Sequence, residues 1–185
     1  MKKGYEIINK EFFYFCYNYL KVYARNIRFR KPKTTHHINA AVVNSSGSYR
    51  LVTHNHPMFI DIYNDFYKNK KKRLTENIFT KEIFTPLMLA VWFMGDGSSN
   101  KRGYIRLATH SFTYKEHYLM RKAFIERFKL SPTIRQLDKN YYLQFHTVDS
   151  QKIIEIVKPY IVHSMKYKVL PILKKDWLKQ NTICE

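Results

Sequence analysis

One carboxylate, Asp96, follows an unbroken run of eight apolar residues from Leu87 to Met94. Thr85 is a good N-cap and Pro86 suits a first helical position, so the run predicts a helix that stops at Gly97. Asp96 would lie at the helix C-terminus, where unpaired carbonyls and the helix dipole disfavour a bare negative charge. A divalent cation would remove that conflict, because Mg²⁺ binds carboxylate and carbonyl oxygens. The alternative interpretation is an ordinary Asp-Gly turn after a core helix.

The predicted helix is apolar on every side, which is typical of a helix buried against another element. Val91 and Gly95 are four residues apart and therefore share one face of the helix. The sequence thus predicts a buried helix with a flat face, where a partner helix can approach closely.

Residues Leu89 to Gly97 resemble the nine-residue signature of the LAGLIDADG homing endonucleases. The longer stretch from Thr85 to Ser98 is similar to the form that this signature takes in organellar introns. Downstream, Thr109 to Phe112 looks like the family's Thr-Gln-Ser-Phe, with His110 in place of Gln. The segment from Pro159 to Lys168 is similar to the family's closing Ser-Met-x-Tyr-Lys, so the resemblance covers roughly residues 10 to 170.

A strand followed by a helix occurs twice in the chain. Tyr49 to His54 and Phe59 to Tyr63 form the first pair, and Tyr141 to His146 and Ile153 to Val157 form the second. An amphipathic helix is predicted before each strand. The two helices span Glu11 to Ala24 and Tyr114 to Phe128, and their periodic apolar positions include Phe12, Phe15, Tyr19, Val22, Leu119, Ala123 and Ile125.

The second half of the chain contains the full αββαββα order that the resemblance implies: signature helix, hairpin over Ser98 to His110, helix, hairpin over Thr133 to His146, and final helix. The first half contains only the later elements. We therefore expect an α+β LAGLIDADG homing-endonuclease fold, with one complete unit and a partial unit that lacks its signature helix and first hairpin. The expected boundaries are a partial unit over 1–67, a basic linker over 68–84, the complete unit over 85–170 and a C-terminal tail over 171–185.

The linker contains the basic run from Lys68 to Arg73. Such a run is best interpreted as a solvated segment, and the alternatives are a nuclear import signal or a phosphate contact.

In the family, two units pair their signature helices, and each contributes one acid to a site that cuts both DNA strands with metal assistance. This sequence holds one acid of that pair, Asp96. Three interpretations stay open. The predicted helix pairs with the same helix of a second copy, or it pairs with a separately encoded fragment, or cleavage has been lost and nucleic-acid binding retained.

The composition indicates a polyanionic partner. Lys and Arg number 33 against 14 Asp and Glu, which gives a net charge of +19 over 185 residues. This excess goes far beyond what solubility needs, so nucleic acid is the expected partner. We find no signal peptide, transmembrane run or lipidation motif, and we expect no membrane attachment. The 15 Tyr and 13 Phe can supply both a core and exposed rings that stack on bases.

Cysteine and histidine spacing gives no sign of a zinc site. Cys16 and Cys184 lie near opposite ends of the chain, which indicates a reducing compartment. The groups at His36-His37 and His54-Asn55-His56 lack paired Cys or helical His spacing, so ordinary surface or strand-end roles are expected.

Strand alternation predicts which side chains face a ligand. Ile105, Leu107, Leu143 and Phe145 would turn inward, and Tyr104, Arg106, His110, Tyr142, Gln144 and His146 outward. The resemblance implies that the sheets form a saddle along the major groove, where Arg suits guanine and Gln suits adenine. The nucleic-acid-binding candidates are Arg28, Arg30, Arg50, Arg102, Arg106, Arg135, Tyr142 and Gln144. Each could instead be a phosphate contact or a solvated charge.

The resemblance also implies catalytic roles. Asp96 holds the acid position of the signature and is the expected metal ligand, to which Gly95 would add a backbone carbonyl. His110 would hold a water molecule, or its presence in place of Gln would indicate that catalytic activity is being lost. Lys168 would neutralise phosphate charge during cleavage or serve as a structural phosphate contact.

Two classes of function follow. As an enzyme, the protein would use Mg²⁺ to make a double-strand break at a long DNA site and so promote intron mobility. As a binding protein, it would hold structured RNA without cutting, as an intron maturase or a component of a larger ribonucleoprotein. The resemblance and a composition rich in Lys, Asn, Ile, Tyr and Phe indicate an organelle, with the mitochondrion expected before the plastid.

Overall fold

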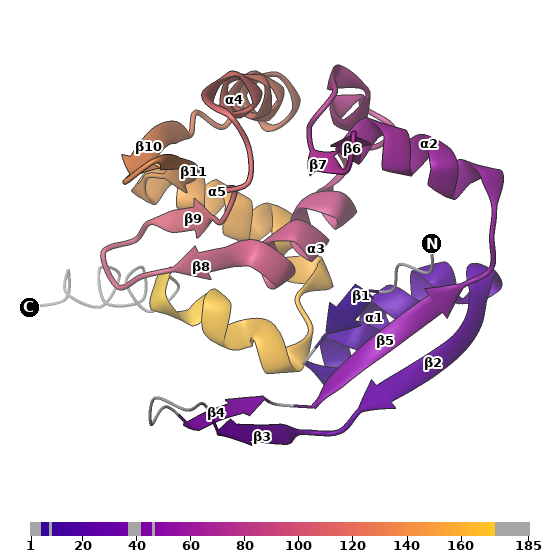
Figure 1. The fold of residues 1–185 in the computed structure, drawn as a ribbon. Coiled ribbons are helices and arrows are strands. Elements are labelled where there is room, and N and C mark those ends of the chain that lie inside the picture. The colour runs from indigo at the N-terminus through magenta and orange to yellow at the C-terminus, as the bar shows by residue number, and fades with distance from the viewer. Residues whose placement is uncertain (1–4, 8, 37–41, 46, 173–185) are drawn as a thin grey trace, which may run out of the picture. The chain divides into compact units, whose positions relative to one another are not determined.

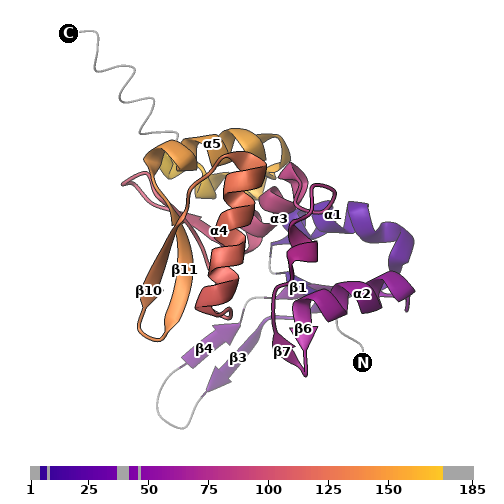
Figure 2. The same cartoon turned by 90° about the horizontal axis from the view of Figure 1, so that it is seen from above.

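The structure is a computed structural model that describes residues 5–7, 9–36, 42–45 and 47–172. Figure 1 and Figure 2 show the arrangement of the elements in two views. The chain divides into two compact units, one built from residues 1–59 and 162–164, the other from 60–161 and 165–185. None of the helices in the described ranges is long and apolar enough to cross a membrane.

The first unit contains a three-stranded antiparallel sheet with the order β1-β5-β2 and one helix packed on it. Phe13 of that helix stacks on Tyr49 of the sheet, with ring centroids 5.3 Å apart. The elements are β1 (Tyr5–Ile7), α1 (Lys10–Leu20), the 3₁₀ helix η1 (Lys21–Tyr23), β2 (Ala24–Arg30), the hairpin strands β3 (Lys33–His36) and β4 (Val42–Ser45), and β5 (Ser48–Thr53). The helix α2 (Pro57–Phe66) follows and continues into the second unit.

The predicted helix over residues 11–24 is too long. α1 ends at Leu20, and Ala24 already pairs with Thr53 in the sheet. Val22 is 77% exposed, so it is not a core position, and Tyr19 is 54% exposed. Strand pairing therefore overrides the helical periodicity that the apolar residues suggest.

The second unit follows the αββαββα order predicted for it. Its sheet is antiparallel with the order β10-β11-β9-β8. The elements are β6 (Tyr67–Lys68), β7 (Lys71–Lys72), η2 (Glu76–Phe79), α3 (Pro86–Asp96), β8 (Gly97–Ser99), β9 (Ile105–Leu107), α4 (Tyr114–Phe128), β10 (Thr133–Leu137), β11 (Asn140–Phe145), α5 (Thr147–Val157), η3 (Lys158–Tyr160) and η4 (His163–Lys168).

The signature helix α3 has the predicted ends. The Thr85 hydroxyl accepts a hydrogen bond from the Met88 N–H, Pro86 is in the first turn, and Gly97 is the C-cap. Its buried side chains, Leu89 and Phe93 among them, belong to a core shared with α4, α5 and the inner face of the sheet. In that core Phe124 of α4 contacts Phe145 of β11 edge to face, with centroids 4.9 Å apart.

The predicted hairpin over residues 98–110 is shorter in the structure. β9 ends at Leu107, and the next N–H, that of Ala108, donates to the Asp96 carbonyl at 3.0 Å. This bond draws the chain away from its strand partner, so His110 lies in a turn and not on the strand.

The basic run from Lys68 to Arg73 is exposed up to Lys72 and folds as a tight hairpin. Asn69 and Lys70 have φ angles of 50° and 63°, which suit a two-residue hairpin turn. The Arg73 Nε donates to the Asn64 carbonyl at 3.0 Å and holds the hairpin against α2.

α4 spans the predicted residues, and of its predicted apolar positions Ala123 is buried, Leu119 is partly buried and Ile125 is 37% exposed. The other buried side chains of the helix are His117, Met120 and Phe124. A capping box formed by Thr113 and Glu116 starts the helix. Glu116 Oε1 also accepts from the Leu74 N–H at 2.8 Å, which orients the helix in its unit.

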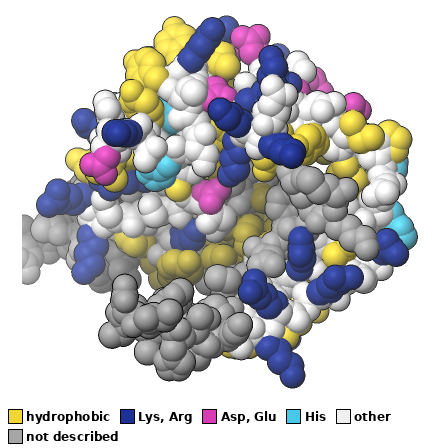
Figure 3. All heavy atoms as spheres, in the orientation of Figure 1, with side chains coloured by type: hydrophobic (Ala, Val, Ile, Leu, Met, Phe, Trp, Pro, Cys, Tyr) yellow, Lys and Arg dark blue, Asp and Glu magenta, His cyan; other side chains and the backbone are white. Residues whose placement is uncertain are grey.

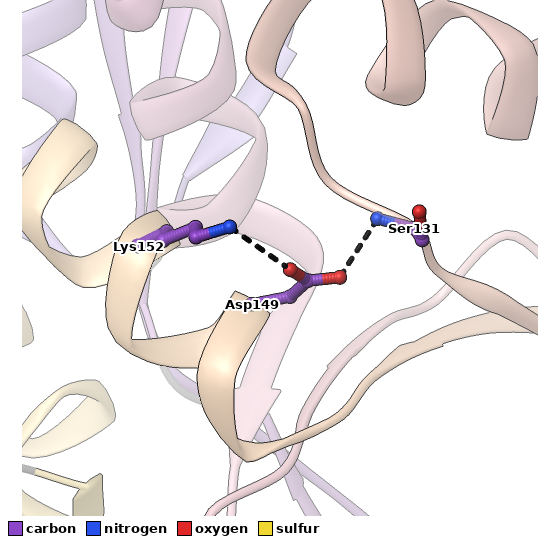
Figure 4. Close-up of polar contacts among 3 residues, drawn as sticks. All are labelled: Ser131, Asp149 and Lys152. Atoms are coloured by element: carbon purple, nitrogen blue, oxygen red, sulfur yellow. Dashed lines mark hydrogen bonds and ion pairs between the residues drawn. The ribbon is translucent and has the colours of Figure 1, made fainter.

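Asp149, in the first turn of α5, ties the segment between α4 and β10 to that helix (Figure 4). Its carboxylate accepts from the Ser131 N–H at 2.7 Å and lies 3.9 Å from the Lys152 ammonium. A negative charge in a first helical turn is favoured by the helix dipole.

The two glycines at the end of α3 should respond oppositely to substitution. A Cβ on Gly97 would lie 2.4 Å from the Phe93 ring and 2.5 Å from the Phe93 carbonyl oxygen, whereas one on Gly95 meets no described atom within 4 Å. We expect Gly97→Ala to lower the free energy of unfolding by about 2 kcal/mol or more. Gly95→Ala should raise it by up to about 1 kcal/mol, since Ala is the better helix former. Urea unfolding of both variants measures the difference, and equal effects would contradict the packing described.

Candidate nucleic-acid and metal site

The carbonyls at the C-terminus of α3 are bound by the side chain of Lys168. Its Nζ lies 2.6 Å from the Met94 oxygen and 2.8 Å from the Gly97 oxygen. The carbonyl oxygens of Phe93 and Gly95 are each 3.4 Å away. The conflict expected at this helix end is therefore relieved by an ammonium group of the chain itself.

Both the side chain and the backbone of Lys168 are bonded to other parts of the second unit. Its own carbonyl accepts a hydrogen bond from the Ser99 hydroxyl of β8. Partial burial lowers the pKa of Lys168 below its ordinary value of 10.5, and the negative charge of Asp96 acts in the opposite direction. The lysine and the signature acid thus influence each other at the same helix end.

Asp96 is exposed at the surface of the second unit. Its backbone carbonyl accepts from Ala108, and no hydrogen bond or ion pair to its carboxylate is found within the described ranges. The same ranges contain no cluster of three or more His, Cys, Asp or Glu that could hold a metal ion. Asp96 is therefore available as a ligand, and any metal site built on it needs further oxygen atoms from water, phosphate or a second acid.

His110 is exposed in the turn after β9, two residues beyond Ala108. Its ring centroid lies 5.9 Å from that of Tyr142. The structure therefore places His110 beside the outer face of the sheet, between the end of α3 and the aromatic ring of β11.

The outer face of the four-stranded sheet carries a linked group of Arg106, Tyr142 and Gln144. Arg106 pairs across the sheet with Gln144, and its Nε donates to Gln144 Oε1 at 3.1 Å. Its guanidinium also lies over the Tyr142 ring, 5.3 Å from the centroid. The opposite, inward positions Ile105 and Leu107 are fully buried, so the predicted alternation is confirmed here.

Gln144 differs from the prediction in one respect. It is on the outer face, but only 5% of it is exposed, because the Arg106 side chain and neighbouring strands cover it. Arg135 is exposed on β10 directly opposite Tyr142. Arg102 is exposed in the turn between β8 and β9, beyond the paired strands. Arg106 and Arg135 are thus the most accessible candidates on the strands of this face.

The first unit has its own group of arginines. Arg28 of β2 pairs with Arg50 of β5, and Arg30 pairs with Ser48, so the three arginines share one face of that sheet. Arg28 and Arg30 are exposed, while Arg50 is partly buried. The other face carries Phe29 and Tyr49, whose rings lie 4.9 Å apart.

A buried polar pair, Thr109 and His117, was missed by the sequence analysis. His117 Nδ1 lies 2.8 Å from the Thr113 carbonyl and therefore carries the proton, and Nε2 lies 2.8 Å from the Thr109 hydroxyl. Burial lowers the pKa of His117 below 6.5. The only local signal is the Thr113-to-His117 spacing of one helical turn, which is too common to predict a buried histidine.

Comparisons with known proteins identify the family and the fold of the chain. The sequence model of the LAGLIDADG DNA endonuclease family matches residues 1–153. The chain therefore belongs to the LAGLIDADG DNA endonuclease family, and the predicted α+β fold of that family is confirmed.

Individual relatives include endonucleases and maturases. The intron-encoded endonuclease ai4 of Dictyostelium discoideum is 40% identical over 124 residues, which cover 65% of this chain and 76% of the relative. The cytochrome b mRNA maturase bI2 of Debaryomyces hansenii is 30% identical over 133 residues, which cover 69% of this chain and 50% of the relative. A solved structure, the homing endonuclease I-WcaI bound to its DNA recognition sequence, is similar with a TM-score of 0.75 and 23% identity, over 89% of this chain and 73% of that one.

Removal of the Lys168 ammonium should destabilise the second unit. Lys168→Met leaves the carbonyls at the end of α3 without their donor, and we expect a loss of about 1–2 kcal/mol in the free energy of unfolding. Lys166→Met is the matched control, because Lys166 is exposed in the same 3₁₀ helix, and it should change stability by less than about 0.5 kcal/mol. Equal losses would show that Lys168 does not cap α3.

The buried His117 should make stability depend on pH. Because its folded-state pKa is lowered, the unfolded chain takes up the proton more readily, so stability is lost as the pH falls below about 6.5. His117→Gln should flatten this part of the profile of unfolding free energy against pH. His54→Gln, which changes an exposed imidazole with no side-chain contact among the described residues, should leave the profile of the wild type unchanged. A wild-type profile that is flat between pH values near 5 and 7 would contradict a buried neutral His117.

Proposed function

We propose that this LAGLIDADG protein is a metal-dependent DNA endonuclease in which Asp96 is the metal-binding acid. The proposal rests on the exposed carboxylate of Asp96, which has no hydrogen bond or ion pair among the described residues and lies at the end of a buried helix whose carbonyls are already bound by Lys168. An acid that is held firmly, yet has no partner in the described part of its unit, suits a ligand that comes from outside the chain.

The residues present fit part of a Mg²⁺ site. Mg²⁺ uses one or two carboxylates together with waters and substrate phosphate oxygens, and Asp96 would supply one of them. The Gly95 carbonyl is the proposed second protein ligand, although its 3.4 Å contact with Lys168 makes it the weaker candidate. When bound, the cation would lower the pKa of a water molecule and offset charge on the scissile phosphate.

The remaining catalytic candidates act beside the cation. His110 is exposed next to the sheet face and would position a water molecule or contact the DNA backbone. The Lys168 ammonium is occupied by carbonyl oxygens, so we assign it the positioning of Asp96 in preference to a direct contact with phosphate.

The sheet faces are the proposed DNA surface. The major groove accommodates β-ribbons, and Arg recognises guanine through two hydrogen bonds. Arg106 and Arg135 of the second unit and Arg28 and Arg30 of the first are exposed on strands and suit this role. The bond from Arg106 fixes the orientation of the Gln144 amide, and because Gln144 is buried we propose that it holds Arg106 in place and does not itself contact a base.

A second acid would complete the site. Family members pair two signature helices, so we propose that a second acid comes from another copy of this chain, from a separate polypeptide or from a longer form of this protein. The face of α3 that carries Val91 and Gly95 is the proposed contact, since Gly95 has open space around it.

The second candidate function is RNA binding without cleavage. It is favoured by the 30% identity to a protein named cytochrome b mRNA maturase and by His110 at the position where the family has Gln. One relative is named an intron-encoded endonuclease and another a maturase of cytochrome b mRNA, and on that basis we propose an organelle, the mitochondrion first, as the location.

Substitution of the signature acid tests whether the protein cleaves DNA. The protein is purified at low salt, and any DNA that accompanies it is sequenced and used as the substrate with Mg²⁺. Asp96→Asn should reduce the cleavage rate at least about a hundredfold and leave DNA binding intact, because it removes a metal ligand and not a basic group.

The matched control is Asp138→Asn, which changes an exposed acid in the turn between β10 and β11. This control should cleave at the wild-type rate. Cleavage by Asp96→Asn at the wild-type rate would refute the role of the acid, and recovery of RNA alone with no DNA would favour the second candidate function.

A further inference from the structure

The outward face of α4 carries aromatic and basic side chains next to one another. Tyr114 is 56% exposed, Tyr118 57% and Ile125 37%, and their spacing of four and seven residues puts them on one side of the helix. In Figure 3, hydrophobic and basic side chains gather at the top of the view, where Figure 1 places α4. We call this surface the α4 stripe, defined as Tyr114, Lys115, Tyr118, Arg121, Lys122 and Ile125.

Tyr118, in the middle of the α4 stripe, is not needed to hold the fold together. The helix packs on β10 and β11 through its buried side, and the side chain of Tyr118 has no hydrogen bond or ring contact in the part of the chain that the structure describes. Tyr114 is oriented by an edge-to-face contact with Tyr141, with centroids 5.3 Å apart. The exposed ring of Tyr118 therefore leaves apolar surface in contact with solvent without a compensating contact among the described residues.

The stripe is also hollowed and positively charged. A shallow, open depression on the surface of the helix lies between Tyr118, Arg121, Lys122, Ile125 and Glu126. Arg121 uses its Nε to bind the Pro132 carbonyl at 3.1 Å, which holds the guanidinium at the edge of the hollow. The one acid there, Glu126, lies 3.9 Å from Lys122 in an exposed pair, so the basic groups prevail.

We infer that the α4 stripe binds single-stranded RNA. Exposed tyrosines stack on unpaired bases, and Lys and Arg beside them bind the phosphates of the same strand. A duplex offers no free base faces to Tyr118, whereas RNA loops do. A protein partner is less suitable, because charged side chains are depleted from the centre of protein interfaces and here lie among the aromatic rings.

This surface is separate from the proposed DNA surface. α4 covers the inner face of the second unit's sheet, and Figure 2 shows it beside β10 and β11, while Arg106 and Tyr142 project from the outer face. The sheet and the helix lie between the two sets of side chains. RNA binding on the α4 stripe therefore does not rest on cleavage by Asp96 and does not compete with DNA on the sheet.

The test measures fluorescence anisotropy of a labelled single-stranded RNA of about 16 nucleotides with the full chain. Tyr118→Ala should weaken RNA binding at least about fivefold, since it removes the ring on which one base stacks. Tyr118→Phe keeps the aromatic face and should bind as the wild type does. Lys122→Gln should weaken binding and reduce its dependence on salt.

The controls separate this surface from the others. Tyr19→Ala removes a tyrosine of nearly equal exposure, 54%, on α1 and should leave RNA binding unchanged. Arg106→Ala should weaken duplex DNA binding and spare RNA binding. If Tyr118→Ala folds with the thermal midpoint of the wild type and still binds RNA equally well, the inference is overturned. Loss of RNA binding in Arg106→Ala with no change in the α4 variants would likewise overturn it, because RNA would then bind the outer face of the sheet.

Discussion

The second unit depends on how its buried helix ends. α3 is apolar and fully packed along one side, yet its last residue, Asp96, must stay at the surface and its last carbonyls must find donors. Gly97 lets the chain leave the helix directly after Asp96, because only a residue without a side chain fits against Phe93 where the chain turns from helix into strand. Lys168 supplies the donor for the last carbonyls, since its single ammonium group lies within reach of several of them. The acid is exposed because these two residues end the helix at that point.

The end of α3 also determines which side chains of the sheet face the core and which face outward. β8 begins at Gly97 and pairs with β9, and the register then places Ile105 and Leu107 in the core and Arg106 outside. Hydrophobic burial favours this register, since a shift by one residue would expose the core residues. The positive charge of this unit lies on several surfaces, among them the outer sheet face, the uncovered side of α4 and the hairpin of β6 and β7.

Local patterns in the sequence predict much of this fold, and long-range contacts account for the rest. Thr85 and Gly97 mark both ends of α3 because capping depends on neighbouring residues alone. The predicted first helix ran on to Ala24 because its apolar spacing continues, while the pairing of Ala24 with Thr53 is invisible to periodicity. The contact of Lys168 with Met94 joins residues 74 positions apart, and no local rule predicts it. Alternation put Gln144 on the correct face, but its burial depends on Arg106 of another strand.

We propose that Asp96 holds a divalent cation at the end of α3. This binding can be measured directly as the loss of amide NMR signals when Mn²⁺ is added to the ¹⁵N-labelled protein bound to duplex DNA. If Asp96 holds the cation, the signals of Asp96, Gly97 and Ala108 broaden first, since these residues lie at the helix end and at the bond that Ala108 makes to it. The same titration of Asp96→Asn should leave them sharp. Equal broadening in both proteins, or broadening confined to residues on the arginine-bearing strands, would contradict the claim.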